Sequence, residues 1–190
     1  MDAIVSFEDL AGAIRELPPS CGPVRVVAVD GPGGSGKTTF AGRLAEALEA
    51  QVIHSDDFPV PWDEPPATWF GHVETQVLGP LAAGEAGCYR RYDWVGGVYT
   101  GRVDVPVAPA LILEGVSTAR RTAPAAFTVW VEAPREIRLA RVLARDGASL
   151  APQWRHWMRA EAEWFAADDT RSRADLVLDG AAVPGEFVAL

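Results

Sequence analysis

The chain has 190 residues, a length that fits one domain with a complete hydrophobic core. Its net charge of −9 argues against general nucleic-acid binding, which needs a basic face, and no apolar run approaches the roughly 20 residues of a membrane span. Residues 1–16 carry acidic side chains and no signal-peptide pattern, so we expect a cytoplasmic protein without a nucleic-acid or membrane partner.

Predicted strands and helices alternate along the chain and define its fold class. Ser6 caps a first helix whose apolar stripe runs to Leu17. A β-branched run at 24–30 predicts a buried strand, and apolar positions at helical spacing predict a helix over 39–48. Further strands are predicted at 51–55, 110–114, 127–131 and 174–178, and further helices over 68–81, from Pro134 onward and over 151–167. This order predicts an α/β fold with a five-stranded parallel sheet in one domain, 1–190.

Residues 88–105 depart from this alternation. The segments 89–94 and 98–103 predict two short strands, and the residues between them, Val95-Gly96-Gly97, are typical of a hairpin turn. A hairpin inserted in a parallel α/β protein often faces a substrate. We therefore expect it beside the functional site, with a purely structural flap as the alternative.

The strongest motif is Gly-Pro-Gly-Gly-Ser-Gly-Lys-Thr at residues 31–38, which fits the phosphate-binding loop G-x-x-x-x-G-K-[ST] between a predicted strand and a predicted helix. The glycines allow backbone N–H groups to surround phosphate oxygens, and the helix N-terminus adds positive potential. Lys37 would reach the β- and γ-phosphates, and the Thr38 hydroxyl would bind Mg²⁺. Lys37 is also the only lysine among 17 basic residues.

This loop predicts that the chain binds a nucleoside triphosphate. ATP is the expected nucleotide, because nothing in the sequence resembles the guanine-reading motif of GTPases. The predicted nucleotide-binding residues of the loop and the helix start are Gly31, Gly33, Gly34, Ser35, Gly36, Lys37, Thr38 and Thr39.

Acidic residues stand at predicted strand ends, where ligands of open α/β folds bind. Glu114 could hold Mg²⁺ through water, or it could cap the next turn. Asp56 or Asp57 could accept the proton of an acceptor hydroxyl, or bind a second Mg²⁺. Asp30 ends the strand before the loop. The pattern alone does not choose between the two neighbouring aspartates.

Arg138, Arg141 and Arg145 recur at i, i+3 and i+7 and share one helix face. We expect this face to neutralise charge on a transferring phosphoryl group, with solvated surface charges as the alternative. A lid-like segment follows at about 145–153. The three histidines have no metal-ligand spacing, and we interpret them as structural or surface residues: His54, His72 and His156.

Together these motifs resemble the uridine kinase (uridine–cytidine kinase) branch of the P-loop kinases. The resemblance covers roughly residues 24–180. It rests on the phosphate-binding loop, Ser55-Asp56-Asp57-Phe58, Tyr92-Asp93-Trp94, Glu114-Gly115 and the Arg138…Arg141…Arg145-Asp146 helix. It implies a three-layer P-loop kinase-like fold with an inserted hairpin (about 88–105) and a lid (about 145–153).

The resemblance also implies roles for single residues. Asp56 would be the base that acts on a ribose 5′-hydroxyl, and Asp57 would support it on the substrate side by binding Mg²⁺ or ordering the loop. Asp63 would lie near the sugar hydroxyls, and Tyr92 would lie against the nucleobase. The arginines that would contact ATP phosphates from the lid are Arg138, Arg141 and Arg145.

The acceptor side departs from the family pattern. Gly96-Gly97 stands where the family has a histidine and a nearby arginine, and Pro59 stands where it often has tyrosine. The arginine-rich lid of the family is replaced by Asp-Gly-Ala-Ser-Leu at 146–150. These changes leave the phosphate half intact and alter the acceptor half.

We therefore expect an enzyme that transfers a phosphoryl group from Mg²⁺-ATP to a small-molecule hydroxyl, as a nucleoside kinase does. A kinase for a sugar, vitamin or nucleotide, and a non-kinase nucleotide-binding regulator, are the alternatives. The sequence does not identify the acceptor, the pathway or the oligomeric state. It is compatible with a homo-oligomer.

Overall fold

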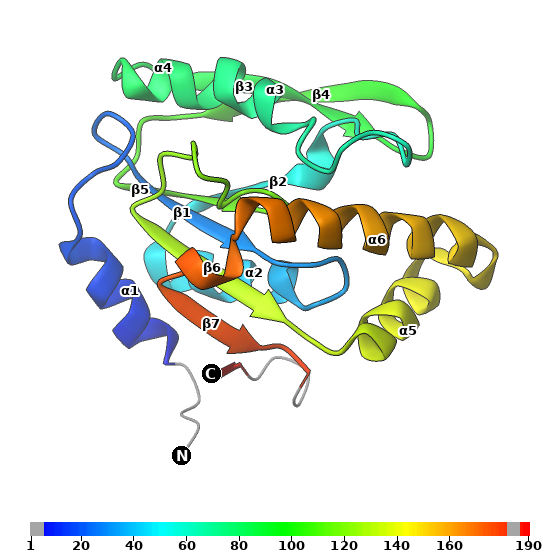
Figure 1. Ribbon diagram of the computed structural model, residues 1–190. Helices are drawn as coiled ribbons and strands as arrows, with labels where there is room; N and C mark the ends of the chain where they lie inside the picture. The colour runs from blue at the N-terminus through cyan, green and yellow to red at the C-terminus, as the bar shows by residue number, and fades with distance from the viewer. Residues whose placement is uncertain (1–5, 182–186) are drawn as a thin grey trace.

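A central, mostly parallel sheet organises the computed structural model, which describes residues 6–181 and 187–190 (Figure 1). The strands lie in the order β2-β5-β1-β6-β7-β8, and the first five pair in parallel. Their bounds are Arg25–Asp30 (β1), Gln51–His54 (β2), Ala110–Glu114 (β5), Phe127–Glu132 (β6), Leu176–Asp179 (β7) and Val188–Ala189 (β8). The predicted five-stranded parallel sheet is confirmed. Residues 1–5 and 182–186 lie outside the described residues. The first range belongs to the start of the chain that was expected to lack a signal peptide, and both belong to the expected single domain, 1–190.

The sixth strand, β8, was not predicted from the sequence. It pairs antiparallel with β7 at the sheet edge and has only two residues, too few for a periodic pattern. Phe187, just before it, packs against Phe40 with ring centroids 5.0 Å apart. A tertiary contact therefore brings this edge strand to the sheet.

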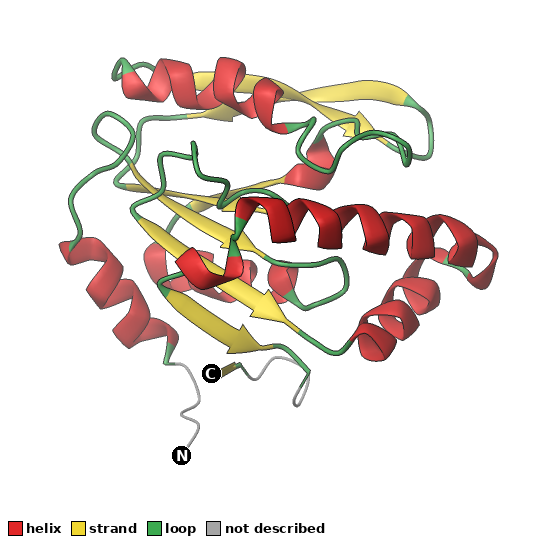
Figure 2. Cartoon of the chain, viewed as in Figure 1, coloured by secondary structure: helices red, strands yellow, loops and turns green. Residues whose placement is uncertain are grey.

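Helices cover both faces of the sheet because side chains of a strand alternate between them. On one face Val27, Val29 and Ile112 pack against α1 (Phe7–Glu16) and α2 (Lys37–Leu48). On the other face, Val26, Leu111 and Leu113 pack beneath the helical segment 70–82 and the hairpin 87–105. These layers are seen in Figure 2, and they confirm the three-layer α/β prediction.

The helix predicted over 68–81 is observed as one continuous helical run that begins two residues later. It consists of α3 (Phe70–Val73), a π-helical turn (Glu74–Leu78) and α4 (Gly79–Ala82), and it ends before Gly84, whose φ is +77°. The predicted hairpin is confirmed as β3 (Gly87–Asp93) and β4 (Val98–Val105), a separate antiparallel pair.

The predicted lid, about 145–153, lies at the junction of two helices that share a small core. α5 (Arg135–Asp146) follows β6, and α6 (Ala151–Asp168) runs back across the sheet end (Figure 1). A 3-10 turn, Ala148–Leu150, joins them. Their buried contact is formed by Val142, Trp154 and Met158. Among the described residues, no helix combines the length and apolar character that a membrane span needs.

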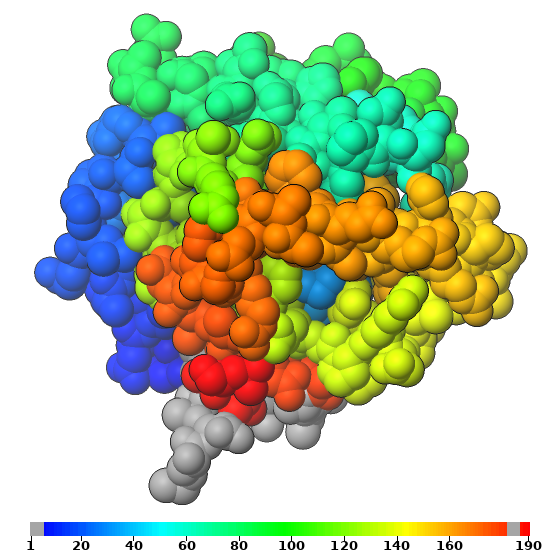
Figure 3. Space-filling view, viewed as in Figure 1, coloured from blue at the N-terminus to red at the C-terminus, as the bar shows by residue number. Residues whose placement is uncertain are grey.

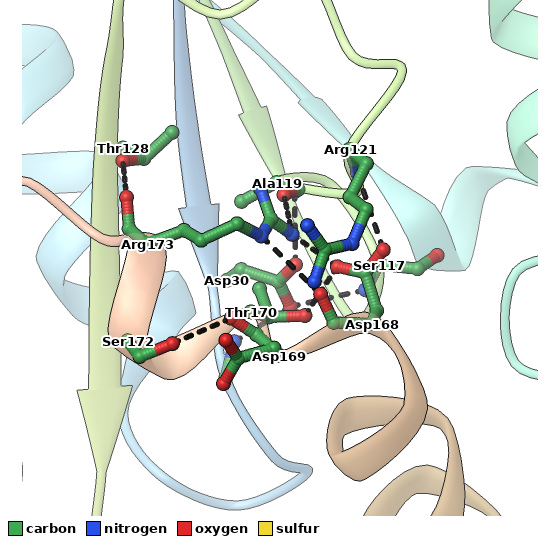
Figure 4. Close-up of polar contacts among 11 residues, drawn as sticks. Asp30, Ser117, Ala119, Arg121, Thr128, Asp168, Asp169, Thr170, Ser172 and Arg173 are labelled. Atoms are coloured by element: carbon green, nitrogen blue, oxygen red, sulfur yellow. Dashed lines mark hydrogen bonds and ion pairs between the residues drawn. The ribbon is translucent and has the colours of Figure 1, made fainter.

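The far end of α6 is tied to the loop after β5 (Figure 4). Arg173, from the 3-10 turn Arg171–Arg173, forms an ion pair with Asp168 and donates to the Ala119 carbonyl at 3.1 Å. Asp168 also accepts the Arg121 N–H at 3.2 Å. This network fixes the base of α6 while its beginning reaches the phosphate-binding loop.

Candidate functional site

The phosphate-binding loop connects β1 to α2 in a conformation that requires glycine. Gly31, Gly34 and Gly36 have φ values of +137°, +79° and +109°. A Cβ on Gly31 would stand 2.1 Å from the Val131 carbonyl oxygen, and one on Gly34 would stand 2.7 Å from the Arg138 carbonyl oxygen. Substitution at either position would therefore both strain the backbone and displace β6 or α5. In Figure 3 the loop after β1 is seen in blue at the bottom of a hollow between α5 and α6.

The inner side of the loop carries the groups that a triphosphate needs. Lys37 is buried, and its Nζ donates to the Pro32 carbonyl oxygen at 3.0 Å, so its charge lies across the loop. The first N–H groups of α2 have no partner within the helix. The Ser35 hydroxyl is buried, and no group among the described residues pairs with it. Thr38 and Thr39 are exposed in the first turn of α2. This donor set fits phosphate oxygens.

Asp30 holds the loop from behind. Its Oδ1 accepts the N–H groups of Gly31 at 2.7 Å and Ser117 at 3.0 Å, and its Oδ2 accepts that of Ala119 at 2.8 Å. Burial raises the pKa of Asp30 to about 7, although these N–H groups and Lys37 favour the charged form. Asp30 therefore fixes the start of the loop to the segment after β5, as Figure 4 shows for its contacts with Ser117 and Ala119.

Glu161 of α6 holds the loop from the lid side, a role that sequence reasoning missed. Its Oε2 accepts the Gly33 N–H at 2.8 Å, and its Oε1 pairs with Arg138 at 2.8 Å. Glu161 is only 1% exposed, and burial raises its pKa against the pull of Lys37 and Arg138. A buried carboxylate without a cation costs several kcal/mol, so this pair holds α5, α6 and the loop together. A glutamate within an aromatic helix was the only sequence signal.

Two arginines of the predicted face, Arg138 and Arg141, lie on the loop, whereas the Arg145 side chain is 60% exposed. Arg138 donates to the Gly33 carbonyl at 3.2 Å, and Arg141 donates to the Gly34 carbonyl at 3.3 Å. Arg145 forms a two-bond pair with Asp146, at 2.6 and 2.9 Å. That pair raises the pKa of Arg145, with smaller contributions from two carboxylates across the cleft, Asp56 and Glu114.

The two neighbouring aspartates point to different partners because residues 55–57 form a 3-10 turn after β2. Asp57 is buried, and its two oxygens accept the Tyr89 hydroxyl at 2.5 Å and the Arg91 Nε at 2.8 Å. Both partners come from β3, and Asp57 and burial raise the pKa of Tyr89 above its usual value. Asp57 thus ties the hairpin to the sheet, and Asp56 is the exposed one.

The electrostatic surroundings of Asp56 suit a base. Protein atoms crowd its carboxylate although solvent reaches it, and this loss of hydration raises its pKa above the usual aspartate value. Glu114 raises the pKa further, while the charges of Lys37, Arg145 and His54 lower it. A carboxylate with a raised pKa holds a proton better and is a stronger base.

Glu114 is buried at the end of β5, and its Oε2 lies 2.7 Å from Nδ1 of His54 at the end of β2. The hydrogen bond to Glu114 raises the pKa of His54. His54, which the sequence indicates is a structural or surface residue, is half-buried and contacts the carboxylate predicted to hold Mg²⁺. The pairing depends on β2 lying beside β5, where these two residues are register partners, and no linear spacing reports that.

Aromatic side chains gather on the acceptor side. The indole N–H of Trp94, in the hairpin turn, donates to the Asp56 carbonyl at 2.7 Å. Tyr92 packs edge-on against Trp94 at 5.2 Å, so the structure brings Tyr92 near Asp56. Asp63 is exposed on the loop before α3. Its neighbour Trp62 contacts Trp154 of α6.

Magnesium fits this set of groups. Thr38 and Glu114, the residues predicted to hold Mg²⁺, would supply one hydroxyl and one carboxylate. Among the described residues, no group of three or more His, Cys, Asp and Glu side chains is arranged as a complete metal site. Mg²⁺ commonly keeps several waters and uses one or two carboxylates together with substrate phosphates, so a partial protein shell is what it requires.

Comparison with known proteins agrees with this geometry. No family model matches the chain. It is 30% identical over 131 residues to a cytidylate kinase of Pyrobaculum arsenaticum, a match that covers 68% of this chain and 65%, under two thirds, of the relative. A proposed uridine kinase from Bacillus stearothermophilus superposes with a TM-score of 0.64 at 21% identity, covering 90% of this chain and 96% of the other. The chain has the P-loop kinase fold.

A second structure with this P-loop kinase fold is a proposed fructose transport system kinase from Silicibacter sp. TM1040. Its TM-score is 0.68 at 22% identity, with 86% of this chain and 95% of the other covered. The resemblance to uridine kinase-like P-loop kinases is thereby confirmed at the level of the fold. Within this fold, Asp56 and Glu114 lie at the carboxyl ends of β2 and β5, Lys37 begins α2 and Arg145 lies near the end of α5; their roles remain predictions.

Proposed function

We propose that this protein is an ATP-dependent phosphotransferase that phosphorylates a hydroxyl of a small, uncharged acceptor, in the manner of a nucleoside kinase. One observation carries the proposal. The exposed carboxylate of Asp56 lies within electrostatic range of Lys37 and Arg145, while the adjacent Asp57 is occupied by Tyr89 and Arg91. Transfer to a hydroxyl needs a carboxylate in that place as the base, and of the two neighbouring aspartates Asp57 is the one that an arginine already pairs with.

The groups of the chain divide the work of phosphoryl transfer. The loop N–H groups and Lys37 bind the phosphates of ATP. Thr38 and Glu114 would hold Mg²⁺, which neutralises phosphate charge. The oxygen of the acceptor hydroxyl bonds to the γ-phosphorus while Asp56 takes the hydroxyl proton. The bond between the γ-phosphorus and the bridging oxygen breaks, and that oxygen leaves with ADP. Arg141 and Arg145 stabilise the charge in transit, whereas Arg138, paired with Glu161, holds the loop.

Charges on the acceptor side favour a nucleoside or sugar over a nucleotide. A phosphate monoester needs an available cation, but on the hairpin Arg91 is paired with Asp57, and Arg90 donates to the backbone carbonyls of Thr100 and Tyr99. Acidic side chains, Asp56 and Asp63 among them, would repel a second phosphate. The name of the similar cytidylate kinase therefore does not transfer to this chain. Tyr92 and Trp94 offer ring faces to a planar base.

A panel of acceptors tests the proposal. ADP release from Mg²⁺-ATP would be measured with uridine, cytidine, their 5′-monophosphates, ribose and fructose, and the products identified by phosphorus NMR. We expect stimulation by a nucleoside or a sugar and none by the monophosphates. Stimulation by a monophosphate alone would overturn the choice of acceptor. ATP-dependent binding of a protein partner without any acceptor-stimulated turnover would instead favour a regulatory protein.

A further inference from the structure

One tryptophan, Trp154 in the first turn of α6, stands where three parts of the site meet. It is 8% exposed. Its ring lies 3.0 Å from where a Cβ on Gly33 would stand, so it covers the phosphate-binding loop. Trp62 lies in the loop before α3, residues 59–69, which we call the acceptor loop, and its ring packs edge-on against Trp154 at 5.2 Å. The Arg145 guanidinium lies 5.7 Å from its ring centroid.

The lid arginine is oriented through this ring. Asp146 grips Arg145 with two hydrogen bonds, a geometry that fixes the plane of the guanidinium. The indole N–H of Trp154 donates to Oδ2 of Asp146 at 3.0 Å and so fixes the carboxylate. The Arg145 side chain is 60% exposed, and an exposed pair contributes little to stability. The pair instead sets the direction of the guanidinium, which Asp146 holds by two hydrogen bonds while Trp154 holds Asp146.

The acceptor loop reaches the same ring from the other side. Trp62 is 37% exposed, and it packs perpendicular to both Trp154 and Trp157, at 5.2 and 6.1 Å. It is adjacent to Asp63, the residue expected near the acceptor. A shift of this loop on acceptor binding would therefore move a ring that is packed on the lid.

We propose that Trp154 is a positioning residue that makes the orientation of Arg145 depend on the seating of Trp62. The inference rests on the proposed function, in which Arg145 acts on the transferring phosphoryl group. An acceptor that displaces or secures the loop thereby changes the orientation of Arg145. Water does not move the loop and therefore does not change that orientation. Discrimination between acceptor and water follows from this contact chain.

A double-variant cycle tests the coupling in turnover. Trp62→Leu, Arg145→Ala and the double variant would be compared by ADP release from Mg²⁺-ATP with uridine as the acceptor probe, and by calorimetric Mg²⁺-ADP affinity. We expect Trp62→Leu to lower kcat about tenfold in the natural background and less than twofold beside Arg145→Ala, with ADP affinity within about twofold. Equal losses in both backgrounds would overturn the proposal.

Control variants separate positioning from general damage. Trp164→Leu removes another half-buried tryptophan of α6, one packed near Arg120, and should lower kcat equally with and without Arg145. Trp154→Phe keeps a ring but loses the N–H to Asp146. Because that N–H fixes Asp146, Trp154→Phe should lower kcat in the natural background and have little effect beside Arg145→Ala, and a kcat equal to that of the unaltered protein would contradict a positioning role.

A third readout needs no acceptor and no catalysis. The urea midpoints of Trp62→Leu, Asp146→Asn and their double variant should shift by less than the sum of the single shifts, because both side chains act on one ring. Additive shifts would overturn the coupling. If the unaltered protein released no ADP with any acceptor, the proposed function would fail, and this cycle would still decide whether Trp154 links the two segments.

Discussion

The phosphate half and the acceptor half of the site are held by different kinds of contact. The phosphate-binding loop is fixed mainly through its backbone, with Asp30 and Glu161 accepting loop N–H groups. The acceptor half is assembled by side-chain pairs between distant segments, such as Asp57 with Tyr89. In the acceptor half, Asp57 and Tyr89 are buried while Trp94 is 49% exposed.

This difference teaches what each half can change. Backbone contacts depend on chain geometry, so the loop accepts few substitutions. Its residues are adjacent in the sequence, and they can therefore be recognised as a motif. Side-chain pairs can be exchanged one at a time, so the acceptor half can take a new substrate while the loop stays the same. Variants in the two halves should therefore differ in which substrate they affect.

The largest effect is expected at the loop lysine. Lys37→Ala should lower ATP turnover at least about 100-fold, because one preorganised charge at a transition state contributes several kcal/mol. Lys37→Arg should also be poor, since a planar guanidinium does not fit a place where Nζ lies 3.0 Å from the Pro32 carbonyl. Steady-state ADP release measures both. Near-normal turnover of both variants would remove Lys37 from the site.

The lid arginine should affect kcat more than binding. Arg145→Ala is expected to lower kcat about 30-fold, less than a fully buried donor would, and to change Mg²⁺-ADP affinity less than threefold. Arg141→Ala should act in the same direction, because Arg141 contacts the Gly34 carbonyl of the loop. Turnover and calorimetry on the same preparations supply the comparison. If a variant kept the kcat of the unaltered protein, the arginine that it lacks would be a solvated surface charge without a role in transfer.

Glu161→Gln tests the backbone-held half directly. It keeps the size of the side chain but leaves Arg138 without its anion, so unfolding free energy should fall by about 2–4 kcal/mol. ADP affinity should fall about tenfold as Gly33 loses its fixed partner. Urea unfolding and calorimetry measure both, with Glu163→Gln, an exposed residue of the same helix, as the matched control. Equal behaviour of the two variants would contradict the role of Glu161.

The smallest effect is expected in the hairpin. Arg91→Gln breaks a pair whose arginine is 55% exposed, while Asp57 keeps the Tyr89 hydroxyl. Stability should therefore fall by less than about 1 kcal/mol. The acceptor KM should rise about threefold, and ADP affinity should not change. A loss of ADP affinity would show that the two halves are not separable in this way.

What could be predicted from the sequence follows the same division. The loop, its strand and its helix are contiguous, so residues 31–38 identified the phosphate half, and periodicity located the five parallel strands and the hairpin. The contact of His54 with Glu114 and that of Glu161 with Gly33 join segments 60 and 128 residues apart. Such pairs depend on sheet order and helix packing, which no local pattern contains.

The neighbouring aspartates illustrate the same limit at short range. The sequence pattern does not choose between them; a 3-10 turn over residues 55–57 separates the two side chains, and the partners of Asp57 come from β3. The aromatic contact between Trp62 and Trp154 was likewise invisible, since each tryptophan by itself is typical of a core position.

The most direct test of the account compares Asp56→Asn with Asp57→Asn. Each keeps the side-chain size and removes one negative charge. Acceptor turnover and Mg²⁺-ADP affinity would be measured on both. We predict that Asp56→Asn abolishes acceptor phosphorylation with ADP affinity close to that of the unaltered protein, while Asp57→Asn remains active with a loosened hairpin. An active Asp56→Asn beside an inactive Asp57→Asn would contradict the assignment of Asp56 as the base.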